Sequence, residues 1–179
     1  MGLYLNPNAD AFQMGLNTEI YVDKSLILSE LNKLVSSQGN FVCLSRPRRF
    51  GKSMAGNMIS AYYSKGCDTR EVFSQMKLGQ EPCFDKYLNK FNVIKLDLDG
   101  WYQNAIVENS VVSLIEEINK SLLVDFRKQF PEIEFEEKSS LARCIKEVYA
   151  ETGEKFVIII DEYDVLIREQ VPQSLFDSY

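Results

Sequence analysis

Apolar residues follow two different periods along the chain, and their alternation predicts strands separated by helices. Compact apolar runs predict strands buried in a sheet, at residues 41–44, 91–98 and 155–160. Apolar residues at helical spacing predict helices, at about residues 25–38, 52–64, 108–129 and 139–150. Because the two kinds of element alternate, we expect an α/β fold with a mostly parallel sheet.

Two segments have no clear period. Residues 1–19 are largely polar, and we expect little regular structure in them. Residues 67–90 contain helix and strand breakers and predict short helices and loops. Ser25 is placed to cap the start of the first long helix, and the pair 39–40, Gly-Asn, is placed to end it.

The composition fits one globular domain and narrows the classes of function. The chain has 179 residues and 45% hydrophobic content, enough to build one core. A net charge of -6 argues against a general nucleic-acid-binding protein, although it allows a local basic patch. Four scattered cysteines and no histidine leave no zinc motif, and we expect reduced, structural thiols. With neither a long apolar run nor a signal-peptide pattern, we expect a cytoplasmic protein with no membrane contact.

A phosphate-binding motif lies between the first predicted strand and the helix after it. Gly51, Lys52 and Ser53 match the end of the pattern G-x-x-x-x-G-K-[ST], and Arg46 stands at the position of the first glycine. Backbone N–H groups and a helix N-terminus form a nest for phosphate, while the lysine neutralises the β and γ oxygens. Ser53 would ligate Mg²⁺. The alternative is that Gly51 only forms a turn and Ser53 only caps the helix.

Two carboxylates follow the most hydrophobic strand. A P-loop magnesium ion is held partly by an acidic residue at the end of a neighbouring strand, and Asp161 fits that role as a metal ligand. Glu162 is placed to polarise the attacking water, so Lys52 and Glu162 are the candidate catalytic residues. Glu162 as a solvated carboxylate at a strand end is the alternative. Asp164 fits a helix cap slightly better than a contact with metal or a partner.

The whole loop is predicted to contact the nucleotide. These cofactor-binding candidates are Arg46, Pro47, Arg48, Arg49, Phe50, Gly51, Lys52, Ser53 and Met54. The three arginines would hold triphosphate, contact a nucleic acid or pair with nearby carboxylates, and proximity to phosphate is the simplest explanation. Trp101 and Tyr102 fit core packing better than a recognition surface.

Three stretches together resemble the predicted AAA-ATPase-like family of bacteria. They are I-Y-V-D-K-S at residues 20–25, S-R-P-R-R-F-G-K-S at 45–53 and I-D-E-Y-D at 160–164. The resemblance extends from about Leu3 to about Glu169, and its arginine-rich loop is more specific than a general P-loop.

The resemblance assigns roles to the matching residues. In this family arginine at the first-glycine position is usual, so Arg46 is not a departure. The family's Walker A functions map onto Gly51, Lys52 and Ser53, and its Walker B functions map onto Asp161 and Glu162. By similarity to related ATPases, the segment 21–24 approaches the adenine.

The resemblance also implies a fold, cofactors and partners. It implies a P-loop NTPase-like three-layer sandwich that binds ATP and Mg²⁺, with a restriction-nuclease-like domain or another protein as effector and nucleic acid only as an indirect partner. The family's ATPase region continues past its second motif, so we expect residues 1–179 to be the N-terminal part of a longer domain, ending soon after the Walker B strand. Within it, residues 1–19 form an irregular segment and residues 20–169 the nucleotide-binding core.

Three functions stay open at this point. The first is Mg-dependent ATP hydrolysis that drives an effector, with slow turnover by this chain alone. The second is a regulatory module in which nucleotide occupancy switches a contact without turnover. The third is direct nucleic-acid binding by the basic residues of the loop.

Overall fold

The computed structural model describes residues 2–45, 47, 50–107 and 111–165 of the chain. Its elements, in chain order, are α1 (Asp10–Leu16), α2 (Leu26–Leu34), α3 (Lys52–Tyr63), α4 (Arg70–Ser74), the 3₁₀ helix η1 (Lys77–Gln80), β1 (Asn92–Asp97), α5 (Leu98–Val107), α6 (Val111–Gln129), α7 (Leu141–Thr152) and β2 (Phe156–Asp161). No helix in these ranges is long and apolar enough to cross a membrane.

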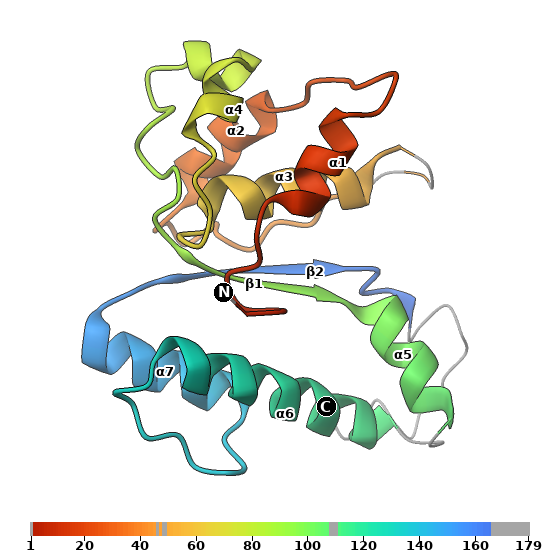
Figure 1. Cartoon of the computed structure of the whole chain (residues 1–179), viewed down its shortest axis with the longest axis vertical. Coiled ribbons are helices and arrows are strands. Elements are labelled where there is room, and N and C mark those ends of the chain that lie inside the picture. Colours follow the sequence, from red (N-terminus) through yellow and green to blue (C-terminus); the bar gives the residue numbers. More distant parts are fainter. Residues whose placement is uncertain (1, 46, 48–49, 108–110, 166–179) are drawn as a thin grey trace.

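Strands β1 and β2 form a parallel pair between two groups of helices. The register runs from Asn92 opposite Phe156 to Asp97 opposite Asp161. Helices α1 to α4 lie on one side of the pair, and α6 and α7 lie on the other (Figure 1). This arrangement is consistent with the predicted α/β class, and the parallel direction of the two strands is as expected.

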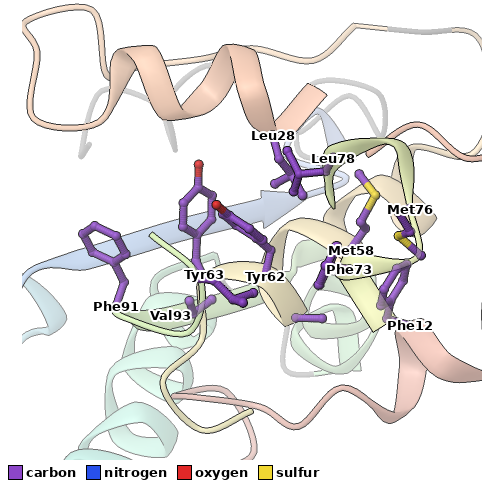
Figure 2. Close-up of a cluster of buried hydrophobic side chains, with 12 residues drawn as sticks. Phe12, Leu28, Met58, Tyr62, Tyr63, Phe73, Met76, Leu78, Phe91 and Val93 are labelled. Atoms are coloured by element: carbon purple, nitrogen blue, oxygen red, sulfur yellow. The ribbon is translucent and has the colours of Figure 1, made fainter. Parts of the chain in front are cut away.

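Aromatic side chains dominate the core on the α3 side of the sheet. Phe12 of α1 stacks on Phe73 of α4 at 5.3 Å between ring centroids, and Tyr62 meets Phe73 edge to face at 5.4 Å. Figure 2 shows these rings gathered with Val93 of β1. A second cluster on the other side packs Ile94 and Leu96 against α6 and α7. Because successive residues of β1 point to opposite faces, the strand is buried on both.

The N-terminal segment is ordered by contacts with distant residues, so the expectation of little regular structure before residue 20 is wrong. Leu5 forms an antiparallel bridge with Ile94, and the Asn6 amide donates to the Val93 carbonyl at 2.7 Å. Asp125 of α6 accepts from the Tyr4 amide at 2.8 Å. Helix α1 follows, anchored by the buried Phe12. Local sequence gives only a weak signal here, because tertiary packing stabilises a short helix more than propensity does.

The predicted strand at residues 41–44 does not form. Phe41 is 95% exposed and Val42 is 52% exposed, so this apolar run is not buried in the sheet. The segment contacts the β2 region through side chains, with Cys43 Sγ 3.4 Å from the Tyr163 hydroxyl. A strand needs a neighbouring backbone for its hydrogen bonds, and β1 is the only strand paired with β2 in the described part of the chain.

Other predicted elements form with shifted ends. Helix α2 ends at Leu34, earlier than the predicted Gly-Asn end at residues 39–40. The region after β1 is the helix α5, which lies between the predicted strand at residues 91–98 and the predicted helix at about 108–129 and was not predicted. Trp101 on α5 is 9% exposed and lies 4.9 Å from Tyr4 between ring centroids, which confirms its packing role. The expectation of short helices in residues 67–90 is confirmed by α4 and η1.

Candidate functional site

Helix α3 begins immediately after the glycine of the phosphate-binding motif. Gly51 has a φ of 76°, a left-handed conformation that glycine adopts without steric cost. The next residues, Lys52 and Ser53, open the helix, where unpaired backbone N–H groups and the helix dipole favour an anion. The alternative interpretation, in which Ser53 caps the helix, is wrong because Gly51 occupies the N-cap position.

The other loop candidates are placed only in part. Arg46, Arg48 and Arg49 lie outside the described residues, so their predicted contacts stay predictions. Pro47 is exposed, and Phe50 is 60% exposed. The side chain of Met54 packs against the aromatic core, which gives it a structural role in addition to the predicted one.

Helix α3 runs antiparallel to the strands and brings its N-terminus to their carboxyl ends. Its last turn lies beside the start of β1, where Ser64 bridges Phe91. In mid-helix, a Cβ built on Gly56 would lie 3.8 Å from a methyl group of Ile159. One helical turn of about 5.4 Å and two strand residues of about 6.6 Å are similar lengths. Ser53, about a turn before Gly56, is therefore level with Asp161, two residues after Ile159.

Asp161 ends β2, and Glu162 turns the chain away from the sheet. The Glu162 amide donates to Asp161 Oδ1 at 3.1 Å. Glu162 has a φ of 51°, which is uncommon for a residue with a side chain and is seen at turns and functional sites. Val165 then donates its amide to the Glu162 carbonyl at 3.1 Å. The structure places Asp164 in this turn and leaves both interpretations of it as predictions.

The tripeptide 23–25 connects the phosphate-binding loop to η1. Lys24 Nζ donates to the Phe50 carbonyl at 2.8 Å, next to Gly51. Asp23 accepts the amides of Ser25 and Lys77, each at 2.8 Å. Burial alone would raise the pKa of Asp23, but these N–H groups outweigh it and hold the pKa below its usual value.

The prediction that Ser25 caps the start of α2 is wrong for its side chain. Ser25 occupies the N-cap position of α2, but its side chain makes no capping bond. Instead the buried Oγ accepts from the Leu78 amide at 3.0 Å. The resemblance marked this segment, but only the fold reveals these contacts with residues far along the chain.

An open cavity lies beside the same tripeptide. It has a volume of about 440 Å³, and apolar and polar side chains both line it, namely Leu16, Tyr21, Asp23, Glu71, Val72, Gln75 and Met76. Its size lies in the range of about 300 to 1,000 Å³ typical of small-molecule sites. Because Asp23 lines the cavity and its neighbour Lys24 contacts Phe50, the cavity lies close to the phosphate-binding loop.

A lysine that the sequence did not single out lies between α3 and the sheet. Lys95 of β1 is half-buried, and its ammonium group hydrogen-bonds Asn57 Oδ1 of α3. Burial lowers the pKa of Lys95, while the nearby Asp161 and Asp97 act in the opposite direction. No local pattern indicates this contact, since a single lysine in an apolar strand fits a solvated position equally well.

The residues predicted to hold a metal ion, Ser53 and Asp161, offer one hydroxyl and one carboxylate group. Within the described ranges, no three His, Cys, Asp or Glu side chains lie together in a metal-binding arrangement. Mg²⁺ usually takes one or two protein oxygens and completes its shell with waters and substrate phosphates. A serine hydroxyl and one carboxylate at the same edge of the sheet meet that requirement.

The chain matches a protein-family model. The family model described as "AAA-ATPase_like: Predicted AAA-ATPase" matches residues 11–178. No curated protein and no solved structure matches the chain. The matched range contains the phosphate-binding loop, α3 and both strands, so the geometry described above lies inside it.

Proposed function

The chain belongs to the predicted AAA-ATPase-like family, and from this premise we propose that it binds ATP with Mg²⁺ and hydrolyses it within the complete protein. The observation that carries the proposal is the meeting of two features at one edge of the sheet. Counting helix turns and strand residues from the Gly56–Ile159 approach, the proposal puts the Gly51-Lys52-Ser53 start of α3 level with Asp161, the last residue of β2, which Glu162 follows. A family name that suggests an ATPase supports the same assignment.

In this proposal the start of α3 holds the phosphates. The backbone N–H groups after Gly51 donate to phosphate oxygens, and Lys52 neutralises the β and γ oxygens. Lys24 supports the loop through its hydrogen bond to the Phe50 carbonyl. The complete sheet is proposed to be the three-layer sandwich of P-loop NTPases.

The carboxylates complete the proposed site. Ser53 and Asp161 hold the metal side, where bound Mg²⁺ neutralises charge that develops on the phosphate. Glu162 accepts a hydrogen bond from the attacking water and withdraws its proton as the γ-phosphate is transferred, a role worth about 10² to 10⁴ in rate. Its turned backbone directs it away from the course of β2.

The cavity beside Tyr21 is the proposed position of the adenine. Tyr21 offers a ring for stacking, and the acceptors of Asp23, Glu71 and Gln75 suit an exocyclic amino group. Asp23 lines this cavity and its neighbour Lys24 contacts the loop, so the proposal puts the adenine in the cavity and the phosphates at the loop.

The second candidate is a regulatory module that binds nucleotide without hydrolysing it, and the contacts of residues 23–25 favour it. Residues 23–25 link the loop to η1, so nucleotide binding can change a remote surface without hydrolysis. Coupling to a nuclease-like domain or another partner is proposed from the resemblance alone.

A Glu162→Gln variant separates the two candidate functions. Loss of hydrolysis with ATP binding kept, measured in the full protein, supports the enzyme, whereas unchanged hydrolysis contradicts the role of Glu162.

Titration with a fluorescent ATP analogue and Mg²⁺ tests the site. We expect saturable binding that ATP displaces better than GTP, and a loss of at least tenfold in affinity for Lys52→Ala. Lys120→Ala removes an exposed lysine from α6, on the other side of the sheet, and should bind as the unmodified chain does. Equal binding by Lys52→Ala and Lys120→Ala, or no binding by a folded chain, would overturn the proposal.

A further inference from the structure

The side chain of Lys24 lies against the peptide that leads into α3. Its Nζ donates to the Phe50 carbonyl at 2.8 Å. A Cβ built on Gly51 would meet the same ammonium group at 3.3 Å. One cation from a distant part of the sequence therefore contacts the peptide unit that joins Phe50 to Gly51.

This peptide unit lies just before the hydrogen bonds of α3 begin. The first of them joins the Gly51 carbonyl to the Ala55 amide at 3.0 Å, and it fixes the peptide that follows Gly51. Turning the preceding peptide over changes ψ of Phe50 and φ of Gly51, and glycine accepts φ of either sign. The 50–51 peptide can therefore turn over at little steric cost unless another contact holds it.

The direction of the 50–51 peptide matters for an anion. In a trans peptide the carbonyl and the N–H point to opposite sides. While the Phe50 carbonyl points to Lys24, the Gly51 N–H must point away from it. A peptide turned over would replace this N–H with a carbonyl oxygen, which repels phosphate, whereas a phosphate nest needs N–H groups that face the ligand.

The Lys24 side chain extends from a backbone that is held at several points. Asp23 accepts the amides of Ser25 and Lys77, each at 2.8 Å. The Lys24 carbonyl accepts the Ile27 amide at 3.0 Å. A bound lysine loses rotamer freedom, and a fixed backbone limits the entropy loss to the side chain itself. The contact with the loop is therefore stronger than one made from a mobile segment.

We propose that Lys24 is a positioning residue that keeps the Gly51 N–H turned toward the phosphates by holding the Phe50 carbonyl on the opposite side. The ammonium group also polarises the peptide, which strengthens the N–H as a donor. The inference rests on the proposed function, because it concerns the loop that binds the nucleotide there. It adds to that site a residue from outside the phosphate-binding motif.

The expected effect on binding follows from the population of the competent loop. Apparent affinity falls in proportion to the fraction of molecules in which the peptide has the correct direction. One net hydrogen bond changes such a population by about two- to tenfold. Loss of the Lys24 donor should weaken nucleotide binding by a similar factor, and the core should stay folded because Lys24 is exposed.

Three substitutions separate the contact from general effects of a surface lysine. Lys24→Met removes the donor and keeps the length of the side chain, whereas Lys24→Arg keeps a charged donor. Lys90→Met is the matched control, because Lys90 is also exposed and donates to a backbone carbonyl, that of Lys86, at 3.0 Å. Lys24→Gln, which is too short to keep the same contact, replaces Lys24→Met if that variant folds poorly.

The first measurement reports on the peptide itself, in protein without nucleotide. The NMR couplings between the Gly51 amide proton and its two α protons depend on φ, so they change when the peptide turns over. We expect Lys24→Met to change these couplings, while Lys24→Arg and Lys90→Met keep the values of the unmodified chain. Unchanged couplings in Lys24→Met would overturn the inference, because the peptide would then keep its direction without the lysine.

The second measurement is the affinity for a fluorescent ATP analogue at fixed Mg²⁺, at low salt and at about 1 M salt, where the screening length is about 3 Å. We expect Lys24→Met to lose at least threefold in affinity at both salt concentrations, and Lys24→Arg and Lys90→Met to stay within twofold of the unmodified chain. No loss, or a loss that disappears at high salt, would overturn the inference, since the second result indicates simple charge attraction. If the unmodified chain binds no analogue, the proposed function fails, and the Gly51 couplings still test the contact.

Discussion

The left-handed backbone of Gly51 sets the direction in which α3 presents its first amide groups. A Cβ at this position would lie 3.3 Å from Lys24 Nζ, the group that holds the Phe50 carbonyl. Alanine therefore meets two difficulties, an unfavourable φ and a crowded neighbour. Both act on the backbone that the proposed phosphate site needs.

We expect Gly51→Ala to lower the free energy of unfolding by about 1 to 2 kcal/mol, the cost of a left-handed residue with a side chain. ATP affinity should fall at least tenfold, because the loop must shift. Urea unfolding and nucleotide titration measure the two effects. Gly100→Ala is the control, since nothing lies within 4 Å of its added Cβ and alanine in α5 should be neutral or stabilising. Equal losses in both variants would contradict the role of the Gly51 backbone.

Asp23 carries a charge that the folded chain stabilises. Its pKa lies below the usual value in the folded state, so its contribution to stability is fully present above the unfolded pKa of about 4. The contribution is lost as the pH falls through the lower, folded pKa. Asp23→Asn replaces one of the two accepting oxygens with a donor.

We expect Asp23→Asn to lower the free energy of unfolding at pH 7 by about 1 kcal/mol, the typical value of one hydrogen bond. Because the unmodified chain becomes protonated at low pH, the difference between the two proteins should shrink toward pH 2. Urea unfolding across this range measures it, with the exposed Glu132→Gln as control. A difference that stays constant with pH would show that the Asp23 charge contributes nothing.

Among the secondary-structure elements, helix α1 is held to the core mainly by one aromatic side chain, Phe12. Phe12 is 1% exposed and stacks on Phe73, whereas Met14 of the same helix is 73% exposed. We expect Phe12→Ala to cost about 3 to 5 kcal/mol and Met14→Ala less than about 0.5 kcal/mol. Chemical denaturation followed by far-UV circular dichroism measures both. A small loss for Phe12→Ala would show that α1 packs loosely on the core.

Sequence periodicity predicted the elements with the strongest local signals and missed those that depend on distant partners. Helices α3, α6 and α7 and both strands lie close to their predicted ranges, because their apolar spacing is regular. Residues 41–44 have the composition of a buried strand, but no neighbouring backbone pairs with them in the described structure. Helix α1 was missed because its stability comes from contacts with α3 and α4.

The sequence predicted the motifs of the candidate site but not the contacts that support them. Spacing singled out Gly51, Lys52, Ser53, Asp161 and Glu162, and their roles stay predictions; Gly51 precedes α3 and Asp161 ends β2. Contacts that support them, such as Lys24 with Phe50, join residues whose separation in sequence has no characteristic spacing. They follow from the tertiary fold, so periodicity cannot indicate them.

At the scale of the whole molecule, exposed apolar side chains favour self-association. Phe41 is 95% exposed, and Ile158 and Ile160 of the neighbouring β2 are 47% and 49% exposed. Monomeric proteins seldom expose contiguous apolar patches next to an unpaired strand edge. Among the described residues, β2 has β1 as its only strand partner.

We expect the chain to self-associate in a concentration-dependent way, and Phe41→Asp to reduce this association several-fold without lowering Tm by more than a few degrees. Sedimentation velocity over a range of protein concentrations measures the effect. Tyr149→Asp introduces the same charge at a side chain of α7 that is 54% exposed and lies outside residues 41–44 and β2, so it should leave association unchanged. Equal reduction by both variants would point to net charge as the cause.

The hydrogen bonds that join residues 4 and 5 to α6 affect the order in which the chain folds during synthesis. The Tyr4 amide reaches Asp125 across 121 positions of sequence, and the Leu5 carbonyl accepts from Gln129 of the same helix at 2.5 Å. A ribosome adds roughly 5 to 20 residues per second, so these partners emerge roughly 6 to 24 s after the tip does. Residues 4 and 5 must therefore wait for α6 after they leave the ribosome, and until then they are available to chaperones and proteases.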